Sequence, residues 1–239
     1  MRRPSKAPSV LCYALAALTL ASLLFLRGRG IDLPTIQLAV LIVSSAFIYA
    51  GGVFLCRRSP DEEKIMRRHV AVIFALYILL LVNFTFFDGS FGRNGSILSS
   101  ASFSEYFRMR GNVVPFRMIY RQTKALIAGN YSLKNYLVNI AGNVAAFAPF
   151  AVFLPLLFKK CAKLRHFLPV VTLIIFSVEA IQIALRVGSF DVDDYILNIS
   201  GALILFALLS TKTGKKITRR ILRPHGDKNT EIKTEQDMT

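Results

Sequence analysis

Long apolar stretches alternate with polar connections along most of this chain. Each apolar stretch is continuous, as expected for a helix that satisfies its own backbone hydrogen bonds in lipid, and about 20 helical residues cross a hydrocarbon core. A strand of a membrane β-barrel would instead alternate apolar and polar positions. The pattern predicts an all-α fold, a polytopic transmembrane helix bundle with about six spans. The expected spans are residues 10–26, 36–56, 70–87, 138–158, 167–185 and 195–210.

Lysine and arginine residues gather at alternate ends of these spans. Four basic clusters fall on one side, at residues 2–6, 57–68, 159–165 and 212–223. The other side carries Arg27, Arg29, Arg186 and the diluted basic residues of a long connection, 88–134. Because short cytoplasmic loops hold the excess of positive charge, we expect both termini in the cytoplasm and the 88–134 connection outside.

The composition fits a membrane protein, since 54% of the residues are hydrophobic. The formal net charge of +16 would suggest a nucleic-acid partner in a soluble chain. Here the basic residues flank apolar spans, where they meet anionic lipid headgroups. We therefore expect a multi-pass protein of the cell membrane whose partners are membrane lipids, and no nucleic acid.

Three of the expected spans carry polar residues in the half that faces outward. The fourth span has two asparagines on one helical face, and the fifth has a glutamate and a glutamine on one face. The sixth begins with three aspartates, and an asparagine follows one turn further in. These residues are Asn139, Asn143, Glu179, Gln182, Asp191, Asp193, Asp194 and Asn198. Together they predict one polar, extracytoplasmic ligand-binding site, although asparagines between helices also serve as hydrogen-bonding contacts.

Glu179 is the residue of this group that is hardest to explain by structure alone. An ionised carboxylate near the middle of a span costs about 2.5–3.5 kcal/mol on insertion scales, so it must face the bundle, a wet cleft or a partner. Such groups are usually functional, and a structural salt bridge is the alternative. Asp191 and Asp194 stand where aspartate caps a helix, but capping explains one acidic residue, not three.

Glu179, Asp191 and Asp194 are therefore the candidate catalytic residues. The same three carboxylates are the candidate ligands of an all-oxygen site for a divalent cation such as Mg²⁺ or Ca²⁺. No other cofactor is expected, because the sequence has no nucleotide-binding glycine motif.

Histidine and cysteine add little to this site. The three histidines, His69, His166 and His225, fall in expected cytoplasmic segments, which argues against phosphohistidine chemistry and against a Ser-His-Asp triad. The three cysteines, Cys12, Cys56 and Cys161, are isolated and lack ligand spacing, so neither a disulfide nor zinc is expected.

The outer connection 88–134 is not simply hydrophilic. Apolar residues follow a roughly helical spacing in its second half: Phe116, Ile119, Thr123, Leu126 and Ile127, with Arg117, Arg121 and Lys124 between them. This pattern predicts an amphipathic helix at the membrane interface, and a cap packed on the helix ends is the alternative. Arg117 would place a cation beside the polar cluster, where a zwitterionic or anionic amphiphile can be gripped.

Several sequence blocks, in this order, resemble those of the VanZ-like family. The blocks are NVVPFRMI (112–119), NIAGN (139–143), FAPF (147–150), LPL (154–156), EAIQ (179–182) and GSFDVDDYILNISGA (188–202). The chain departs from the family pattern at Phe150, where glycine is usual, and at Ser200, where threonine is usual. Arg186 precedes the last block, whereas the family often has arginine within it.

The resemblance covers about residues 77–209 and suggests a division of the chain. Residues 1–69 form an N-terminal two-span addition, residues 70–210 form the VanZ-like four-span domain with its outer loop (88–134), and residues 211–239 form a basic, then polar, cytoplasmic tail. The family implies a bacterial cell-envelope membrane protein. Its namesake is associated with low-level resistance to the glycopeptide teicoplanin, which carries a fatty chain.

Two functions stay open at this point. The first is a protein that binds or shields an amphiphilic ligand, either a lipid-linked wall precursor or a lipoglycopeptide, and so contributes to low-level teicoplanin resistance. The second is an intramembrane enzyme acting on a lipid-linked envelope substrate, with Glu179 or an aspartate as general base and a bound cation as electrophile.

Overall fold

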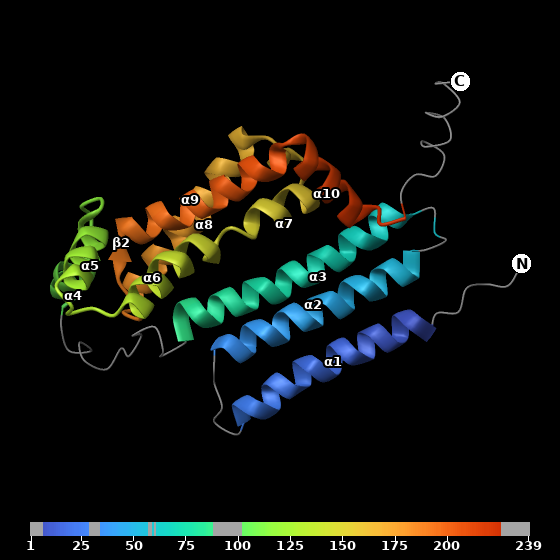
Figure 1. The fold of residues 1–239 in the computed structure, drawn as a ribbon, viewed down its shortest axis with the longest axis horizontal. Helices are drawn as coiled ribbons and strands as arrows, with labels where there is room; N and C mark the ends of the chain where they lie inside the picture. Colours follow the sequence, from blue (N-terminus) through green and yellow to red (C-terminus); the bar gives the residue numbers. More distant parts are fainter. Residues whose placement is uncertain (1–6, 29–33, 57–58, 60, 88–101, 226–239) are drawn as a thin grey trace, which may run out of the picture. The chain divides into compact units, whose positions relative to one another are not determined.

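The computed structural model describes residues 7–28, 34–56, 59, 61–87 and 102–225. Helices dominate the described residues (Figure 1). The chain divides into two compact units, a first unit of residues 1–80 and 211–239 and a second unit of residues 81–210. The predicted polar tail from residue 226 onward, and residues 88–101 of the outer connection, lie outside the described residues.

The first unit contains α1 (Ala7–Gly28), α2 (Pro34–Cys56), α3 (Glu62–Val82) and α10 (Lys212–Leu222). Helices α1 and α2 pack along each other, and the Thr19 and Ser44 hydroxyls lie 2.7 Å apart between them. The Tyr13 hydroxyl of α1 also lies 2.6 Å from His69 Nε2 of α3. Hydrogen bonds of this kind between apolar helices stabilise helix association in lipid.

The second unit contains the remaining elements. They are η1 (Asn83–Phe87), α4 (Phe103–Arg110), β1 (Gly111–Asn112), α5 (Arg117–Ile127), α6 (Leu133–Ala146), α7 (Phe150–Leu157), η4 (Lys159–Ala162), α8 (Leu164–Ala184), β2 (Phe190–Asp191) and α9 (Val192–Ser210). Helices α6, α8 and α9 run side by side, and α4 and α5 lie at the end where β2 leads into α9 (Figure 1).

Five helical segments in the described residues are long and apolar enough to span a membrane. They are Ile36–Cys56, Glu62–Phe87, Leu133–Leu157, Leu164–Ala184 and Val192–Ser210. The all-α fold is therefore confirmed, and these five segments overlap five of the six predicted spans. The predicted first span falls in α1, whose apolar part, Ala7–Leu23, is shorter than the others. The count of six and the cytoplasmic placement of both termini stay predictions.

The fourth predicted span is interrupted rather than continuous. Helix α6 ends at Ala146 and α7 begins at Phe150, with Pro149 at the N-cap position of α7. Proline has no N–H to donate, its ring clashes with the preceding helical turn, and it disfavours helical geometry in the residue before it, here Ala148. The segment is thus two short helices in series, which the apolar run alone did not reveal.

Helices α6 and α9 approach each other so closely that only glycine fits at the contact. A Cβ atom on Gly201 would lie 1.8 Å from the Val144 carbonyl oxygen. Ala202 beside it is fully buried. This close approach brings the polar face of α6 against the start of α9, where the predicted site residues lie.

Candidate functional site

The acidic loop, residues 188–194, is tied to the outer connection by a short parallel strand pair. Gly111 pairs with Phe190 and Asn112 with Asp191. The Asn112 side-chain amide donates to Asp191 Oδ1 at 2.9 Å, and the Tyr106 hydroxyl donates to the Gly188 carbonyl at 2.6 Å. The loop between α8 and α9 therefore holds α4 and β1 in place.

Asp193 caps helix α5 from another part of the chain. Its Oδ1 accepts the Phe116 N–H, and its Oδ2 accepts the N–H groups of Met118 at 2.6 Å and Ile119 at 3.1 Å. The N-cap residue of α5 is Phe116, which has no side-chain acceptor. A carboxylate at this position satisfies free amides and meets the positive end of the helix dipole. Only 1% of Asp193 is exposed, so its role here is structural.

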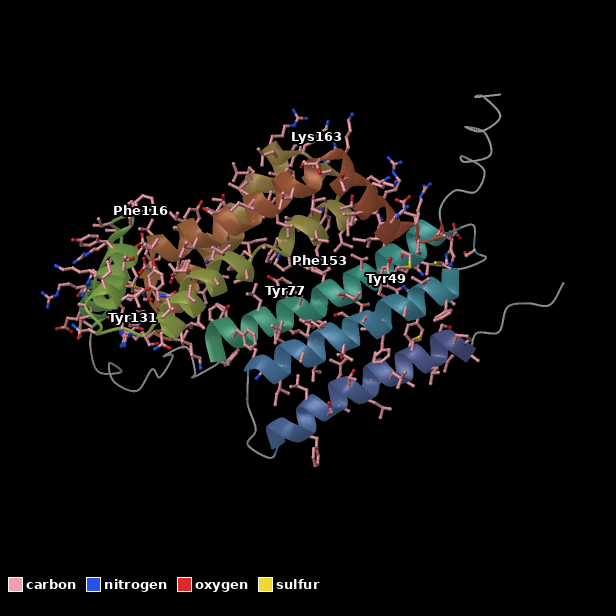
Figure 2. All side chains as sticks on the ribbon, viewed as in Figure 1. Tyr49, Tyr77, Phe116, Tyr131, Phe153 and Lys163 are labelled. Atoms are coloured by element: carbon pink, nitrogen blue, oxygen red, sulfur yellow. The ribbon has the colours of Figure 1, made fainter. Side chains whose placement is uncertain are left out.

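The turn that enters α5 has a strained backbone. The Arg117 N–H donates to the Val114 carbonyl at 3.3 Å, which closes a turn with Pro115 and Phe116 in the middle. Phe116 has φ 62° and ψ 5°, the position of a type II turn that usually belongs to glycine. Its ring is exposed at the α5 end of the second unit (Figure 2). Phe116 thus places an exposed aromatic ring at a position where the backbone conformation favours glycine.

Glu179 and Asp191 are buried beside each other. The Asp191 N–H donates to Glu179 Oε2 at 3.3 Å, and the Asp193 N–H donates to Asp191 Oδ1 at 2.9 Å. Burial raises the pKa of Asp191 above its ordinary value, and the hydrogen bonds from Asp193 and Asn112 oppose that rise. Glu179, which lies in a membrane-length helix, is therefore next to Asp191, whose neutral form is favoured by burial.

The two asparagines of α6 form a chain of hydrogen bonds to α9. Asn143 Nδ2 donates to Asp194 Oδ1 at 2.5 Å and to Asn139 Oδ1 at 3.1 Å. One turn further along α9, Asn198 is only 3% exposed, and its Oδ1 has no hydrogen-bond partner among the described residues. An unpaired buried acceptor costs about 1–3 kcal/mol, so this oxygen needs a donor beyond those that the described residues supply.

Gln182 has a partner away from the carboxylates. Its Nε2 donates to the Thr85 carbonyl of η1 at 3.1 Å. Helix α8 ends just after it in a Schellman motif, with Arg186 in the left-handed conformation at φ 57° and the Val187 N–H donating to the Gln182 carbonyl. The Arg186 guanidinium lies 6.0 Å from the centre of the Tyr106 ring. These contacts fix the end of α8 below the acidic loop.

The exposed face of α5 combines cations with apolar side chains. Its exposed residues recur at helical spacing: Arg117, Tyr120, Arg121, Lys124 and Ile127. The opposite face packs on α6, where the Thr123 and Tyr136 hydroxyls lie 3.1 Å apart. Helix α5 therefore packs on the rest of the second unit through its inner face. Its outer face is an amphipathic surface, on which Ile127 is 82% exposed.

The structure thus brings seven of the nine candidate residues into one connected region at the start of α9. Asn139, Asn143 and Asp194 form one hydrogen-bonded group, Glu179, Asp191 and Asp193 form another, and Asn198 lies buried on α9. Gln182 faces η1 instead. Arg117 is exposed on α5 and forms no side-chain ion pair with any residue that the structure describes.

The three candidate cation ligands do not converge. Among the described residues, one set of three ligand-type side chains brings its ligand atoms within 4.8 Å of one another, and it consists of Cys56, Glu62 and His225 in the first unit. At the acidic loop, the Asp191 carboxylate accepts from Asn112 and the Asp194 carboxylate accepts from Asn143, and Glu179, Asp191 and Asp194 form no such set among the described residues.

Sequence reasoning did not identify Asn112 and Tyr106 as part of this region. Asn112 opens the same sequence block that contains Arg117, so its position in the motif was a usable signal. Tyr106 gave no such signal, because its partner is a backbone carbonyl 82 residues away.

These observations define a helical membrane protein whose polar groups gather at one end of its second unit. Within this class, the chain belongs to the VanZ/LLP1 family, whose sequence model matches residues 74–213, more than half of the chain. The match confirms the resemblance carried by the sequence blocks. Comparison with the curated proteins gives no match, and comparison with the solved structures gives none.

Proposed function

We propose that this chain is a cell-envelope protein that binds an amphiphilic ligand at the extracytoplasmic surface and so contributes to low-level teicoplanin resistance. The ligand class is a lipoglycopeptide or a lipid-linked wall precursor, which combines an acyl chain with a polar headgroup. Membership of the VanZ/LLP1 family supports this reading, since the namesake of the family is associated with teicoplanin resistance.

The exposed face of α5 is the observation that carries the proposal. Three cations lie on the same helical face as two apolar side chains, Tyr120 and Ile127. Cations pair with an anionic headgroup, and the apolar side chains contact an acyl chain, as in other interfacial amphipathic helices. The Asp193 cap fixes this helix on the start of α9, so the surface does not need to be ordered when the ligand binds.

Asn198 supplies a second element of recognition. Its unpaired Oδ1 lies one helical turn from Asp194, which is itself engaged with Asn143. A hydroxyl or amide group of a ligand headgroup provides the missing donor. Recognition then combines charge at α5 with one specific hydrogen bond inside the polar cluster.

The test compares two triple variants that remove the same charge. In the first, Arg117, Arg121 and Lys124 on α5 become glutamine. In the matched control, Lys159, Lys160 and Lys163, exposed near the other end of the Leu133–Leu157 segment, become glutamine (Figure 2 marks Lys163). The α5 variant should lose resistance in a teicoplanin-susceptible host, and the control should keep it.

Direct binding is measured with fluorescent teicoplanin and purified protein in neutral phosphatidylcholine nanodiscs. The α5 variant should bind at least about tenfold more weakly, as expected when about 1.4 kcal/mol of interaction is lost. A glycopeptide without a fatty chain should bind weakly to both proteins. Equal behaviour of the two triple variants in both assays would show that the α5 surface is not the binding site.

The buried Glu179 and Asp191 pair favours the enzyme alternative. A carboxyl group whose pKa is raised by burial is suited to donate a proton, and a neighbouring carboxylate is suited to accept one. The discriminating substitutions are Glu179→Gln and Asp191→Asn. Product formation from a lipid-linked precursor that these substitutions abolish supports the enzyme, whereas loss of resistance without any lipid conversion supports binding. If resistance survives both substitutions, the cluster is structural.

A further inference from the structure

A second group of chemically reactive side chains lies in the first unit, away from the acidic loop. Cys56 ends α2, Glu62 begins α3, and His225 follows α10. The Cys56 Sγ lies 4.0 Å from Glu62 Oε1 and 3.9 Å from His225 Nδ1, and Glu62 Oε1 lies 3.1 Å from His225 Nδ1. Three different ligand atoms, a sulfur, an oxygen and a nitrogen, thus face one another.

We infer that Cys56, Glu62 and His225 form a zinc site. Tetrahedral zinc binds nitrogen and oxygen at about 2.0–2.1 Å and sulfur at about 2.3 Å, which places its ligand atoms about 3.3–3.6 Å apart. The two observed separations from the Cys56 sulfur, 4.0 and 3.9 Å, are longer than these values, and the separation between Glu62 and His225, 3.1 Å, is shorter. Small side-chain rotations are therefore enough to admit the ion, and no backbone movement is required.

The chemistry of the three ligands selects the metal. Magnesium and calcium take oxygen ligands, whereas a thiolate with an imidazole and a carboxylate suits zinc. Cys56 is 2% exposed, so the sulfur is shielded from bulk solvent. On binding, the thiol releases its proton, and Nδ1 of His225 coordinates while the ring proton stays on Nε2. Water completes the fourth position.

Glu62 is the carboxylate available to this site. Its neighbour Glu63 is occupied, because it pairs with Arg67 and with Arg223, each at 2.9 Å. Glu62 instead accepts the His225 backbone N–H at 2.8 Å, which aims the histidine at Cys56. The pairing of the two adjacent glutamates with different partners leaves Glu62 facing the thiol.

The site joins two ends of the chain. Cys56 and Glu62 belong to the hairpin of α2 and α3, while His225 follows the basic helix α10. The Tyr49 hydroxyl donates to the Ile221 carbonyl at 3.3 Å, and Arg223 pairs with Glu63, so the segment after α10 already lies on the hairpin. A zinc ion there holds this segment in place much more firmly than these two contacts do.

The test is the metal content of the full chain purified without chelators. Elemental analysis should find about one zinc per chain, and cobalt added to the chelated protein should give a thiolate-to-metal charge-transfer band, as for other cysteine-containing zinc sites. Cys56→Ala and His225→Asn should each lower the zinc content at least about tenfold, a loss of about 1.4 kcal/mol or more in binding. Asparagine keeps an N–H donor for Glu62, so the second variant retains the local hydrogen bond.

Cys161→Ala is the matched control, because Cys161 is also a free, buried cysteine but belongs to no such ligand set among the described residues. It should bind zinc like the unsubstituted chain. Chelation should also speed tryptic cleavage after Arg220, just before the segment that the ion holds, in the unsubstituted chain and not in His225→Asn. Zinc content that is absent, or equal in all four proteins, would overturn the inference.

Discussion

At the scale of single residues, Asp193 shows how an acidic side chain can look like a ligand site and act as a cap. Two facts assign it to α5: both oxygens accept backbone N–H groups of that helix, and the residue is buried. Asp194, its neighbour, points instead to Asn143 of α6. Adjacent aspartates therefore serve different helices, and substituting each in turn separates their roles.

Asp193→Ala should uncap α5. Loss of the carboxylate leaves three N–H groups at the start of α5 without their acceptor, at a cost of about 2 kcal/mol. Hydrogen exchange of the α5 amides, followed by mass spectrometry, should then speed up about thirtyfold, since 1.4 kcal/mol corresponds to a factor of ten. Asp194→Asn is the control and should leave exchange in α5 unchanged. Protection of α5 that persists in Asp193→Ala would show that another contact holds the helix.

The role of Asp193 could not be read from the sequence because its partners are distant. The capped amides lie 74 to 77 residues before the aspartate. Helix capping is recognised in a sequence when the cap is next to its helix, and here that local position is taken by Phe116. The sequence correctly predicted that Asp193 lies at the start of a helix, here α9. It contained no signal that the same carboxylate also caps the start of α5.

At the scale of elements, close contact between α6 and α9 keeps the polar cluster together. Gly201 lies against the Val144 carbonyl, and the hydrogen bond from Asn143 to Asp194 crosses the same interface. Small residues at such contacts let helices approach in lipid, where packing and hydrogen bonds replace the hydrophobic driving force. The interface is thus sensitive to one added methyl group.

Gly201→Ala should destabilise the second unit by about 3 kcal/mol, because the new methyl group overlaps the backbone of Val144 and the helices must separate. Unfolding in detergent, followed by circular dichroism during titration with sodium dodecyl sulfate, measures the change. Gly142→Ala on α6 is the control, since a Cβ there meets no atom within 4 Å. That variant should gain about 1 kcal/mol from helix propensity. Equal midpoints for the two variants would rule out a tight contact at Gly201.

The helical elements were largely predictable because their signal is local and repeated. Apolar runs identified five segments of membrane length, and the amphipathic spacing identified α5. The two-residue strands β1 and β2 were not predictable, since so short a pairing leaves no periodic pattern. The break before α7 had a local signal in Pro149, but the apolar character of the run outweighed it in the prediction.

At the scale of the whole molecule, the proposed ligand site depends on which side of the membrane the acidic loop faces. The distribution of basic residues predicts the outside. Asn130 and Lys160 are exposed and lie beyond opposite ends of the Leu133–Leu157 segment. These two positions report the orientation better than Asp191, which is buried and would react poorly.

Single cysteines at Asn130 and Lys160, in a chain without its native cysteines, should therefore differ in intact cells. An impermeant maleimide added outside should label the cysteine at 130 and not the one at 160. Labelling of both after the cells are opened serves as the control for reactivity. The reverse pattern would place the acidic loop in the cytoplasm and contradict a ligand site on the outer surface.

The bond between Asp193 and α5 also determines the order in which the protein is assembled. Translation makes α5 first, and two hydrophobic segments, Leu133–Leu157 and Leu164–Ala184, follow before the ribosome reaches Asp193. A helix of 11 residues without its cap is marginal in water. The segment therefore receives its cap only when α9 has been made, and a nascent chain stalled after α8 carries α5 without it. The surface proposed to meet the ligand is among the last parts of the protein to mature.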